Sequence, residues 1–365
     1  MSDKKEATAY ILSAATDERR PPNVSANSIS NYQPKSKKQM LETISMSELY
    51  DNVYPSKPPL IDGLLHTGVY LFAGAPKVGK SFLIAQIAYH ISRGEPLWEY
   101  SVRKSTVLYL ALEDDYSRLQ ERFYRMFGIE GTNNLFFSIM ADTLDGGLIE
   151  QLENFIEEHS DTRLIVIDTL RMVRRMGTDN YSYANDYKVI TGLKRFAYDY
   201  GVCVLLVHHT RKQNADDTFD KISGTTGLLG AADGAFILQK ERRTGNKATL
   251  EVSGRDQQEQ KVYLIRNTET LLWEFEKAET ELWKEPPEPL LDEIAGRVMK
   301  NISYWEGSAS ELVALLETEV QANIITKRLN ILSGRLYDEH GIHYKKGRCH
   351  EGRKIILWKD TEKTA

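Results

Sequence analysis

The sequence predicts an α/β protein with a largely parallel β-sheet, followed by a small C-terminal domain of three helices and a hairpin. Strand-like and helix-like segments alternate between residues 69 and 207, which is the pattern of a parallel sheet covered by helices. The runs 164–167 and 202–207 are almost wholly aliphatic, as expected of strands that are buried on both faces. After residue 290 helical patterns predominate, which indicates a separate domain.

The elements of the first domain follow one another in a regular order. An irregular lead-in, residues 43–65, contains three prolines that disfavour helix. The strands expected next are 69–73, 107–112, 135–140, 164–167 and 202–207. The helices expected between them are 80–92, 116–127 and 147–159. Three later strands, 234–239, 248–252 and 260–266, are spaced as antiparallel neighbours at the edge of the sheet.

Composition divides the chain into four regions. Residues 1–42 are rich in Ser, Asn, Lys, Pro and Glu, which predicts a disordered arm. Residues 43–282 form the expected α/β core, and the proline-containing stretch 283–290, WKEPPEPL, is the expected linker. The small domain spans residues 291–365, with helices expected at 290–304, 308–317 and 324–339 and a hairpin at 342–359.

Overall composition is that of an ordinary soluble protein. The 365 residues are 41% hydrophobic and 27% charged, with a net charge of −5 that says nothing about partners until its distribution is examined. Two cysteines, Cys203 and Cys349, are too few for a disulfide framework or a metal site. Neither a signal peptide nor a membrane-spanning run is evident, so we expect a cytoplasmic protein that does not enter a membrane.

A phosphate-binding loop follows the first strand. Residues 74–81, GAPKVGKS, fit the pattern G-x-x-x-x-G-K-S/T, in which backbone N–H groups face the phosphates, the lysine reaches the β and γ oxygens and the hydroxyl holds Mg²⁺. The strand before the loop and the helix after it are the context that this motif needs. We therefore expect ATP and Mg²⁺ to be bound by Gly74, Ala75, Pro76, Lys77, Val78, Gly79, Lys80, Ser81 and Phe82.

Two further carboxylates fit the chemistry of triphosphate hydrolysis. Asp168 closes the strand RLIVID and is the expected second ligand of Mg²⁺, beside Ser81, although such an Asp can also be a simple turn residue. Glu113 follows the strand VLYLAL and is the expected base that activates water. Asp114 and Asp115 are its rivals, and carboxylates at a helix N-terminus also suit the helix dipole.

Two histidines end another core strand. His208 and His209 follow VCVLLV, at the end of a strand where open α/β sheets bind their ligands. One imidazole is expected to contact the γ-phosphate and to sense its loss, while the other packs or binds backbone. The sequence does not decide between the two.

The order of these motifs resembles a known family. GAPKVGKS, YLALEDD, LIVIDTLR, LLVHHTRK, SGTTGLLGAADGAFIL and EVSGRD together resemble the RepA-type branch of the RecA-like ATPases, which is similar to DnaB-type helicases and KaiC-like proteins. The resemblance covers residues 60–266. It implies a RecA-like core in which Lys80 and Ser81 bind triphosphate and Mg²⁺, Asp168 is the second metal ligand and Glu113 is the catalytic base.

The resemblance also implies an assembly and a partner. Such cores hydrolyse ATP at subunit interfaces of a ring, here expected to be a hexamer, with an arginine from the neighbouring subunit stabilising phosphate charge. Arg255 is the expected finger, with Arg242 and Arg243 as competitors. The polar stretch 211–226, with Lys212 and Lys221, matches a loop that faces nucleic acid, although a solvated loop would look the same.

The small domain carries a positive charge of its own. Residues 321–359 hold nine Lys or Arg and three acids, a local net charge of +6 in an acidic chain. Three helices and a hairpin are the outline of a winged helix, which fits contacts to DNA phosphates or, alternatively, a protein-binding module. The expected DNA contacts are Lys327, Arg328 and Arg335 on the last helix and Lys345, Lys346, Arg348 and Arg353 on the hairpin.

Three functional hypotheses follow from this sequence. The first is an ATP-driven, RepA-like replicative helicase or translocase on single-stranded DNA, serving a plasmid, phage or integrated element. The second is a DNA-binding regulator or helicase loader whose assembly is switched by ATP, with duplex DNA bound by the C-terminal domain. The third is a recombinase-like filament ATPase. Because no N-terminal helical collar is evident, ATPase activity is more firmly expected than unwinding.

Overall fold

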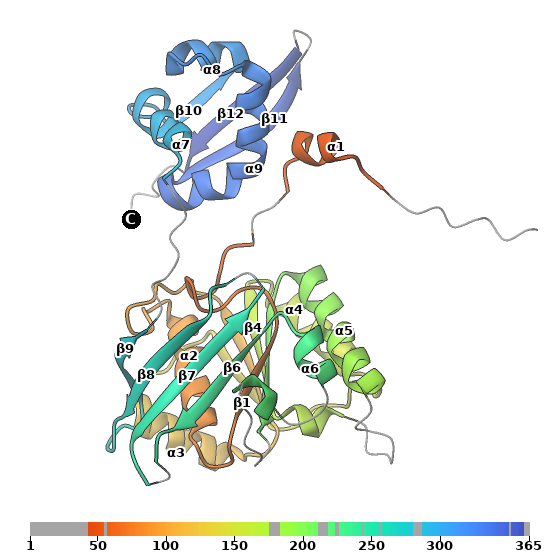
Figure 1. Ribbon diagram of the computed structural model, residues 1–365, viewed down its shortest axis with the longest axis vertical. Coiled ribbons are helices and arrows are strands. Elements are labelled where there is room, and N and C mark those ends of the chain that lie inside the picture. Colours follow the sequence, from red (N-terminus) through yellow and green to blue (C-terminus); the bar gives the residue numbers. More distant parts are fainter. Residues whose placement is uncertain are drawn as a thin grey trace, which may run out of the picture. The chain divides into compact units, whose positions relative to one another are not determined.

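The computed structural model describes residues 43–54, 57–174, 183–210, 218–222, 226–242, 244–255, 257–279, 287–349 and 352–360. Figure 1 shows the arrangement of the elements within the α/β core and within the small domain. The arm expected at residues 1–42 lies outside the described residues, as do residues 283–286 of the expected linker. In the part of the chain that the structure describes, no helix is both long and apolar enough to span a membrane.

The core is built on one large, mostly parallel sheet (Figure 1). Its strands lie in the order β3-β2-β4-β5-β1-β6-β7-β8-β9, and the first six are parallel to one another. The predicted α/β class is confirmed. The strands are β1 (Gly68–Gly74), β2 (Thr106–Ala111), β3 (Leu135–Ser138), β4 (Thr162–Asp168), β5 (Cys203–His209), β6 (Gly234–Lys240), β7 (Lys247–Gly254), β8 (Gln260–Arg266) and β9 (Trp273–Ala278).

Helices cover both faces of this sheet (Figure 1). The helices α2 (Lys80–Arg93) and α3 (Tyr116–Phe127) pack on one face, in a cluster with Phe72, Val166 and Leu205. The helices α4 (Leu148–Glu158), α5 (Tyr183–Tyr200) and α6 (Thr226–Ala231) pack on the other face. Alternate residues of each strand therefore enter different cores, which explains the continuous aliphatic runs in the sequence. The short helix α1 (Met46–Asp51) precedes the core.

Several elements differ from the sequence-based expectation. The strand β6 pairs in parallel with β1 near the middle of the sheet, whereas the sequence placed it with the antiparallel edge strands. Only β7, β8 and β9 continue the sheet in antiparallel fashion. The short connections of this region reveal that successive strands reverse direction, but they do not reveal which strand the first one joins. The elements α1, α5, α6 and β9 were not expected.

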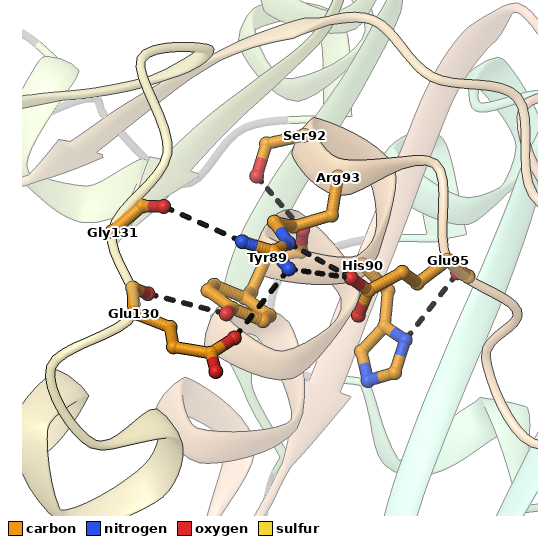
Figure 2. Close-up of polar contacts among 7 residues, drawn as sticks. All are labelled: Tyr89, His90, Ser92, Arg93, Glu95, Glu130 and Gly131. Atoms are coloured by element: carbon orange, nitrogen blue, oxygen red, sulfur yellow. Dashed lines mark hydrogen bonds and ion pairs between the residues drawn. The ribbon is translucent and has the colours of Figure 1, made fainter.

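The helix that follows the phosphate loop is anchored at its far end (Figure 2). Arg93, in the last turn of α2, contacts Glu95 at 2.8 Å and Glu130 at 3.5 Å. The hydroxyl of Tyr89 donates a hydrogen bond to the Glu130 carbonyl at 3.2 Å, and its ring stacks on Phe127. Exposed ion pairs contribute little by themselves, so the stacked rings carry most of this anchor. It ties α2 to the segment that follows α3.

The small domain has a hydrophobic core of its own and a three-stranded sheet in the order β10-β12-β11. Its elements are α7 (Pro289–Glu293), a π-helical turn Ile294–Val298, β10 (Tyr304–Gly307), α8 (Ala309–Leu316), α9 (Ala322–His340), β11 (Ile342–Cys349) and β12 (Gly352–Lys359). The first helix is shorter than expected, because Tyr304–Gly307 pairs with β12 as an edge strand instead of extending the helix. The hairpin lies where the sequence predicted it.

Candidate nucleotide site

The phosphate loop connects the end of β1 to the start of α2, and its motif glycines are required by their surroundings. Gly79 has a φ of 108°, a conformation that side chains disfavour. A Cβ atom at Gly79 would lie 2.9 Å from the ring of Trp273, and one at Gly74 would lie 2.7 Å from the Leu238 carbonyl oxygen. Glycine is therefore the residue that lets this backbone run between β6 and β9.

Lys80 is buried within the loop. Its Nζ donates hydrogen bonds to the carbonyl oxygens of Gly74 at 2.8 Å and Ala75 at 3.1 Å. Burial lowers the pKa of Lys80 to about 8, and the nearby charges of Asp168 and Glu113 oppose this shift. A buried ammonium that is incompletely neutralised favours the binding of an anion.

Asp168, at the end of β4, accepts two hydrogen bonds on one carboxylate oxygen. The hydroxyls of Ser81 and Tyr109 donate to its Oδ2 at 2.9 Å and 3.0 Å. Burial raises the pKa of Asp168, and the two hydrogen bonds oppose that shift. A serine hydroxyl beside a carboxylate is an oxygen donor set that suits Mg²⁺, which takes one or two protein ligands and fills its other positions with phosphate and water. The residues present therefore fit the expected ion.

The three carboxylates after β2 lie in different environments. Glu113 accepts a hydrogen bond from the Thr169 hydroxyl at 2.9 Å, next to Asp168. Asp114 instead pairs with Arg122 at 2.7 Å, and Asp115 caps α3 by accepting from the Arg118 N–H at 2.9 Å. Both rivals thus have structural partners of their own. Of the three carboxylates, Glu113 is the one that is bonded to the residue after Asp168.

Strand alternation separates the two histidines. His209 Nδ1 lies 3.4 Å from Lys80 Nζ, and burial together with the lysine charge lowers the pKa of His209. His208 is the next residue back along β5, so its side chain points to the opposite face of the sheet, where α5 and α6 pack. The structure therefore brings His209, and not His208, to the phosphate loop.

These side chains line a cavity of about 470 Å³ at the carboxyl ends of the parallel strands. The residues in or beside it that sequence analysis missed include Tyr109, Arg122, Thr169, Arg266 and Trp273. Arg266 could have been noticed, because it closes an apolar strand just as Asp168 does. A Mg²⁺-bound triphosphate fits this cavity, which offers a buried lysine, the loop backbone and paired hydroxyl and carboxylate oxygens.

Comparison with known families adds the deciding observation, since residues 35–215 match the family described as AAA domain. This segment is an AAA-type P-loop ATPase domain. Its sheet, helices and loop confirm the RecA-like P-loop core that the motifs implied. Comparison with curated protein sequences gives no match.

Three solved structures are similar to part of the chain. One of them, itself an ATPase domain, is 15% identical over 58% of this chain and 85% of that chain, with a TM-score of 0.48. The KaiC-like protein PH0186 of Pyrococcus horikoshii OT3 is 14% identical over 62% and 99% of the two chains, with a TM-score of 0.43. A DnaB-like replicative helicase, solved in a study of its interactions with primase, is 14% identical over 57% and 58%, with a TM-score of 0.47. No conclusion about activity follows at these values.

The expected arginine finger lies away from the cavity of its own ATPase domain. Arg255 follows β7, where its N–H donates to the Asp233 carbonyl at 2.8 Å, at the amino ends of the parallel strands. Its side chain is exposed. Arg242 is also exposed, but it lies in the turn between β6 and β7, on the same edge of the sheet as the phosphate loop. Arg243 lies outside the described residues.

The expected DNA contacts fall into separate groups. Lys212 lies outside the described residues, and Lys221 lies in a short helical turn after β5. On α9, Arg328 pairs with Glu288 and Arg335 pairs with Glu339, while Lys327 is partly exposed. On the hairpin, Lys346 is partly buried. The hairpin cations with exposed side chains are Lys345, Arg348 and Arg353.

Proposed function

We propose that the chain binds ATP with Mg²⁺ in the cavity of its ATPase domain and hydrolyses it. The observation that carries the proposal is the convergence of Lys80, the Ser81–Asp168 pair and the Glu113–Thr169 pair at one edge of the sheet. These groups come from the ends of two strands, β2 and β4, and from the start of one helix, α2, so their meeting is a property of the fold.

Each group has a distinct task in this proposal. Lys80 exchanges its bonds to the loop carbonyls for bonds to phosphate oxygens. Ser81 and Asp168 would hold Mg²⁺, which would neutralise charge on the phosphates. Glu113 accepts the proton of the attacking water, while the Thr169 hydroxyl keeps one of its oxygens in place. His209, within reach of Lys80, is positioned to respond when the terminal phosphate leaves.

We further propose that ATP hydrolysis drives movement along single-stranded DNA, as in a replicative helicase of a mobile element, and that the working form is a hexameric ring. The resemblance in motif order supports this assignment. Arg255 supports it as well, because an exposed arginine at the opposite edge of the sheet can reach a nucleotide only on another subunit. Arg242 is the competing finger.

A specific observation favours a second candidate, a DNA-bound regulator that ATP switches between assembly states. Arg348 and Arg353 lie directly opposite each other on the hairpin, and like charges at such positions destabilise a hairpin unless an anion lies between them. A winged helix could place these residues on the DNA backbone. The α9 cations are less available, because acids of the same domain already pair with two of them.

One experiment separates the two candidates. ATP turnover by the full chain is measured with and without single-stranded DNA, and the oligomeric mass is recorded in the same buffer. Strong stimulation of a ring-sized particle is the result expected of a translocase. Slow turnover that DNA does not change, in a monomer or dimer, would overturn the translocase and favour the regulator. Absence of any ATP turnover would overturn the hydrolysis proposal itself.

A further inference from the structure

Arg266 is one of the charged residues of the cavity that the proposed chemistry does not use, and unlike Arg118 and Arg122 it does not pair with Asp114. It ends β8, and its guanidinium lies 4.2 Å from the centre of the Phe82 ring and 5.8 Å from that of Trp273. Its Nε makes a long hydrogen bond, 3.4 Å, to the Leu271 carbonyl. Among the residues that the structure describes, no carboxylate pairs with Arg266.

The surroundings of Arg266 are unfavourable for an isolated cation. Arg266 is partly buried, and burial, with the nearby Arg125 as a second cause, lowers the pKa of Arg266. Arg125 itself is exposed and bonds to the carbonyls of Thr268 and Glu269. Aromatic faces therefore provide the main stabilisation of the Arg266 charge in the described structure. A ligand placed against the guanidinium would add to it.

The position of Arg266 indicates which part of a nucleotide it would meet. Lys80, Asp168 and Glu113 define the γ-phosphate end of the cavity, so the nucleoside leaves the loop at the other end, past Phe82 at the start of α2. Arg266 lies at that end, with its Nη1 only 3.5 Å from where a Cβ of Gly79 would stand. Arg266 therefore lies against the phosphate loop, on the side where the nucleoside is expected.

The chemistry of this surface is that of a stacking platform. A guanidinium and an aromatic ring both bind the faces of nucleobases, and such stacking tolerates any base because every base has a π-face. The described residues that line the cavity include no Asn or Gln that could read the edge of a base. We propose that the Arg266 guanidinium, which lies on the Phe82 ring, binds the nucleobase by stacking, so that the site prefers purines to pyrimidines and does not distinguish adenine from guanine. This inference rests on the proposed nucleotide binding.

The test compares nucleotides with a triphosphate that has no base. Dissociation constants of ATP, GTP, CTP and inorganic tripolyphosphate, each with Mg²⁺, are measured for the wild type and for Arg266→Ala. In the wild type, ATP and GTP should bind equally and CTP more weakly. Arg266→Ala should weaken ATP and GTP about tenfold, or about 1.4 kcal/mol, and leave tripolyphosphate unchanged. Arg125→Ala removes the neighbouring exposed cation and should change none of these constants.

Three outcomes would overturn the platform. If Arg266→Ala weakens the binding of ATP and tripolyphosphate equally, Arg266 is a phosphate contact. If Arg266→Ala leaves ATP binding unchanged, the role of Arg266 is structural. If the wild type strongly prefers ATP to GTP, the site must contain a group that hydrogen-bonds to the edge of the base. Far-UV circular dichroism and a thermal unfolding curve report whether the variant keeps its fold. If the wild type binds neither ATP nor tripolyphosphate, the proposed function has failed. If Lys80→Ala abolishes both while Arg266→Ala changes neither, only the platform has failed.

Discussion

The cavity of the ATPase domain and the hairpin of the small domain both gather charge, but they do so in opposite ways. In the cavity, Lys80 and Asp168 are buried. Lys80 donates a hydrogen bond to a carbonyl oxygen of the phosphate loop, and Asp168 accepts one from the Ser81 hydroxyl. On the hairpin, Arg348 and Arg353 are exposed, and neither has an acidic partner among the described residues. A buried, bonded group has a defined geometry and can serve one chemical step. Exposed cations of this kind offer charge without fixed geometry.

This difference predicts how the two regions respond to substitution. Single changes in the cavity should have large effects that salt hardly alters, since the groups are shielded from solvent ions. Changes on the hairpin should have modest, additive effects that depend strongly on salt.

The largest effect is expected for Lys80→Ala. Loss of the ammonium removes the main countercharge for the triphosphate, so ATP turnover should fall by at least about a thousandfold. Turnover is measured with saturating Mg²⁺-ATP, and Lys104→Ala, the same change at an exposed lysine outside the cavity, is the control. Substantial ATPase activity in Lys80→Ala would refute the site.

The next largest effect is expected for Glu113→Gln. The amide cannot accept the proton of water, so turnover should fall roughly a hundred- to a thousandfold while ATP still binds. Equilibrium binding and turnover are measured on the same preparation. Asp115→Asn is the matched control, because asparagine can still cap α3, and it should keep most of the activity. Lost activity in Asp115→Asn together with retained activity in Glu113→Gln would favour Asp115 over Glu113.

A smaller effect concerns stability and pH. The pKa of Lys80 is lowered in the folded protein from 10.5 to about 8, so the unfolded chain binds the proton more tightly. Below pH 8 this costs stability on the order of 3 kcal/mol, and the cost disappears as pH rises from about 8 to about 10.5.

Lys80→Met should therefore be more stable than the wild type at pH 7, and the difference should shrink toward pH 10. Urea denaturation without nucleotide at several pH values measures it. Lys77→Met removes an exposed ammonium of the same loop and controls for the change in net charge. A difference between Lys80→Met and wild type that does not vary with pH would contradict the buried-charge account.

The smallest effect is expected for the double variant Arg348→Ala, Arg353→Ala. Loss of two phosphate contacts should weaken DNA binding about tenfold at low salt and reduce the slope of log affinity against log salt by about 1.4 for single strands. Anisotropy with a labelled oligonucleotide measures both. Arg328→Ala with Arg335→Ala is a contrasting pair, since acids already neutralise these side chains. An unchanged slope in the hairpin variant would show that Arg348 and Arg353 do not contact DNA phosphates.

Much of the ATPase domain was predictable because its signals are local. The loop 74–81 encodes its own conformation, since its two glycines and its lysine act within eight residues. The aliphatic runs of β4 and β5 predicted buried strands, and Asp168 could be placed at the end of β4. By contrast, α5 begins with polar and β-branched residues and ends in an aromatic stretch, so its helical pattern is weak in the sequence.

The sequence by itself determined the phosphate loop, the α/β class and the set of polar residues at the strand ends. Only the tertiary structure decided which of them meet. It placed His209 beside Lys80, because α2 covers one face of the sheet, and it brought Arg266 onto the Phe82 ring. It also placed Glu113 against the Thr169 hydroxyl, whereas Asp114 pairs with Arg122. The physical reason is that these contacts depend on strand order and on which face each helix covers, and both are set by packing between segments far apart in the chain.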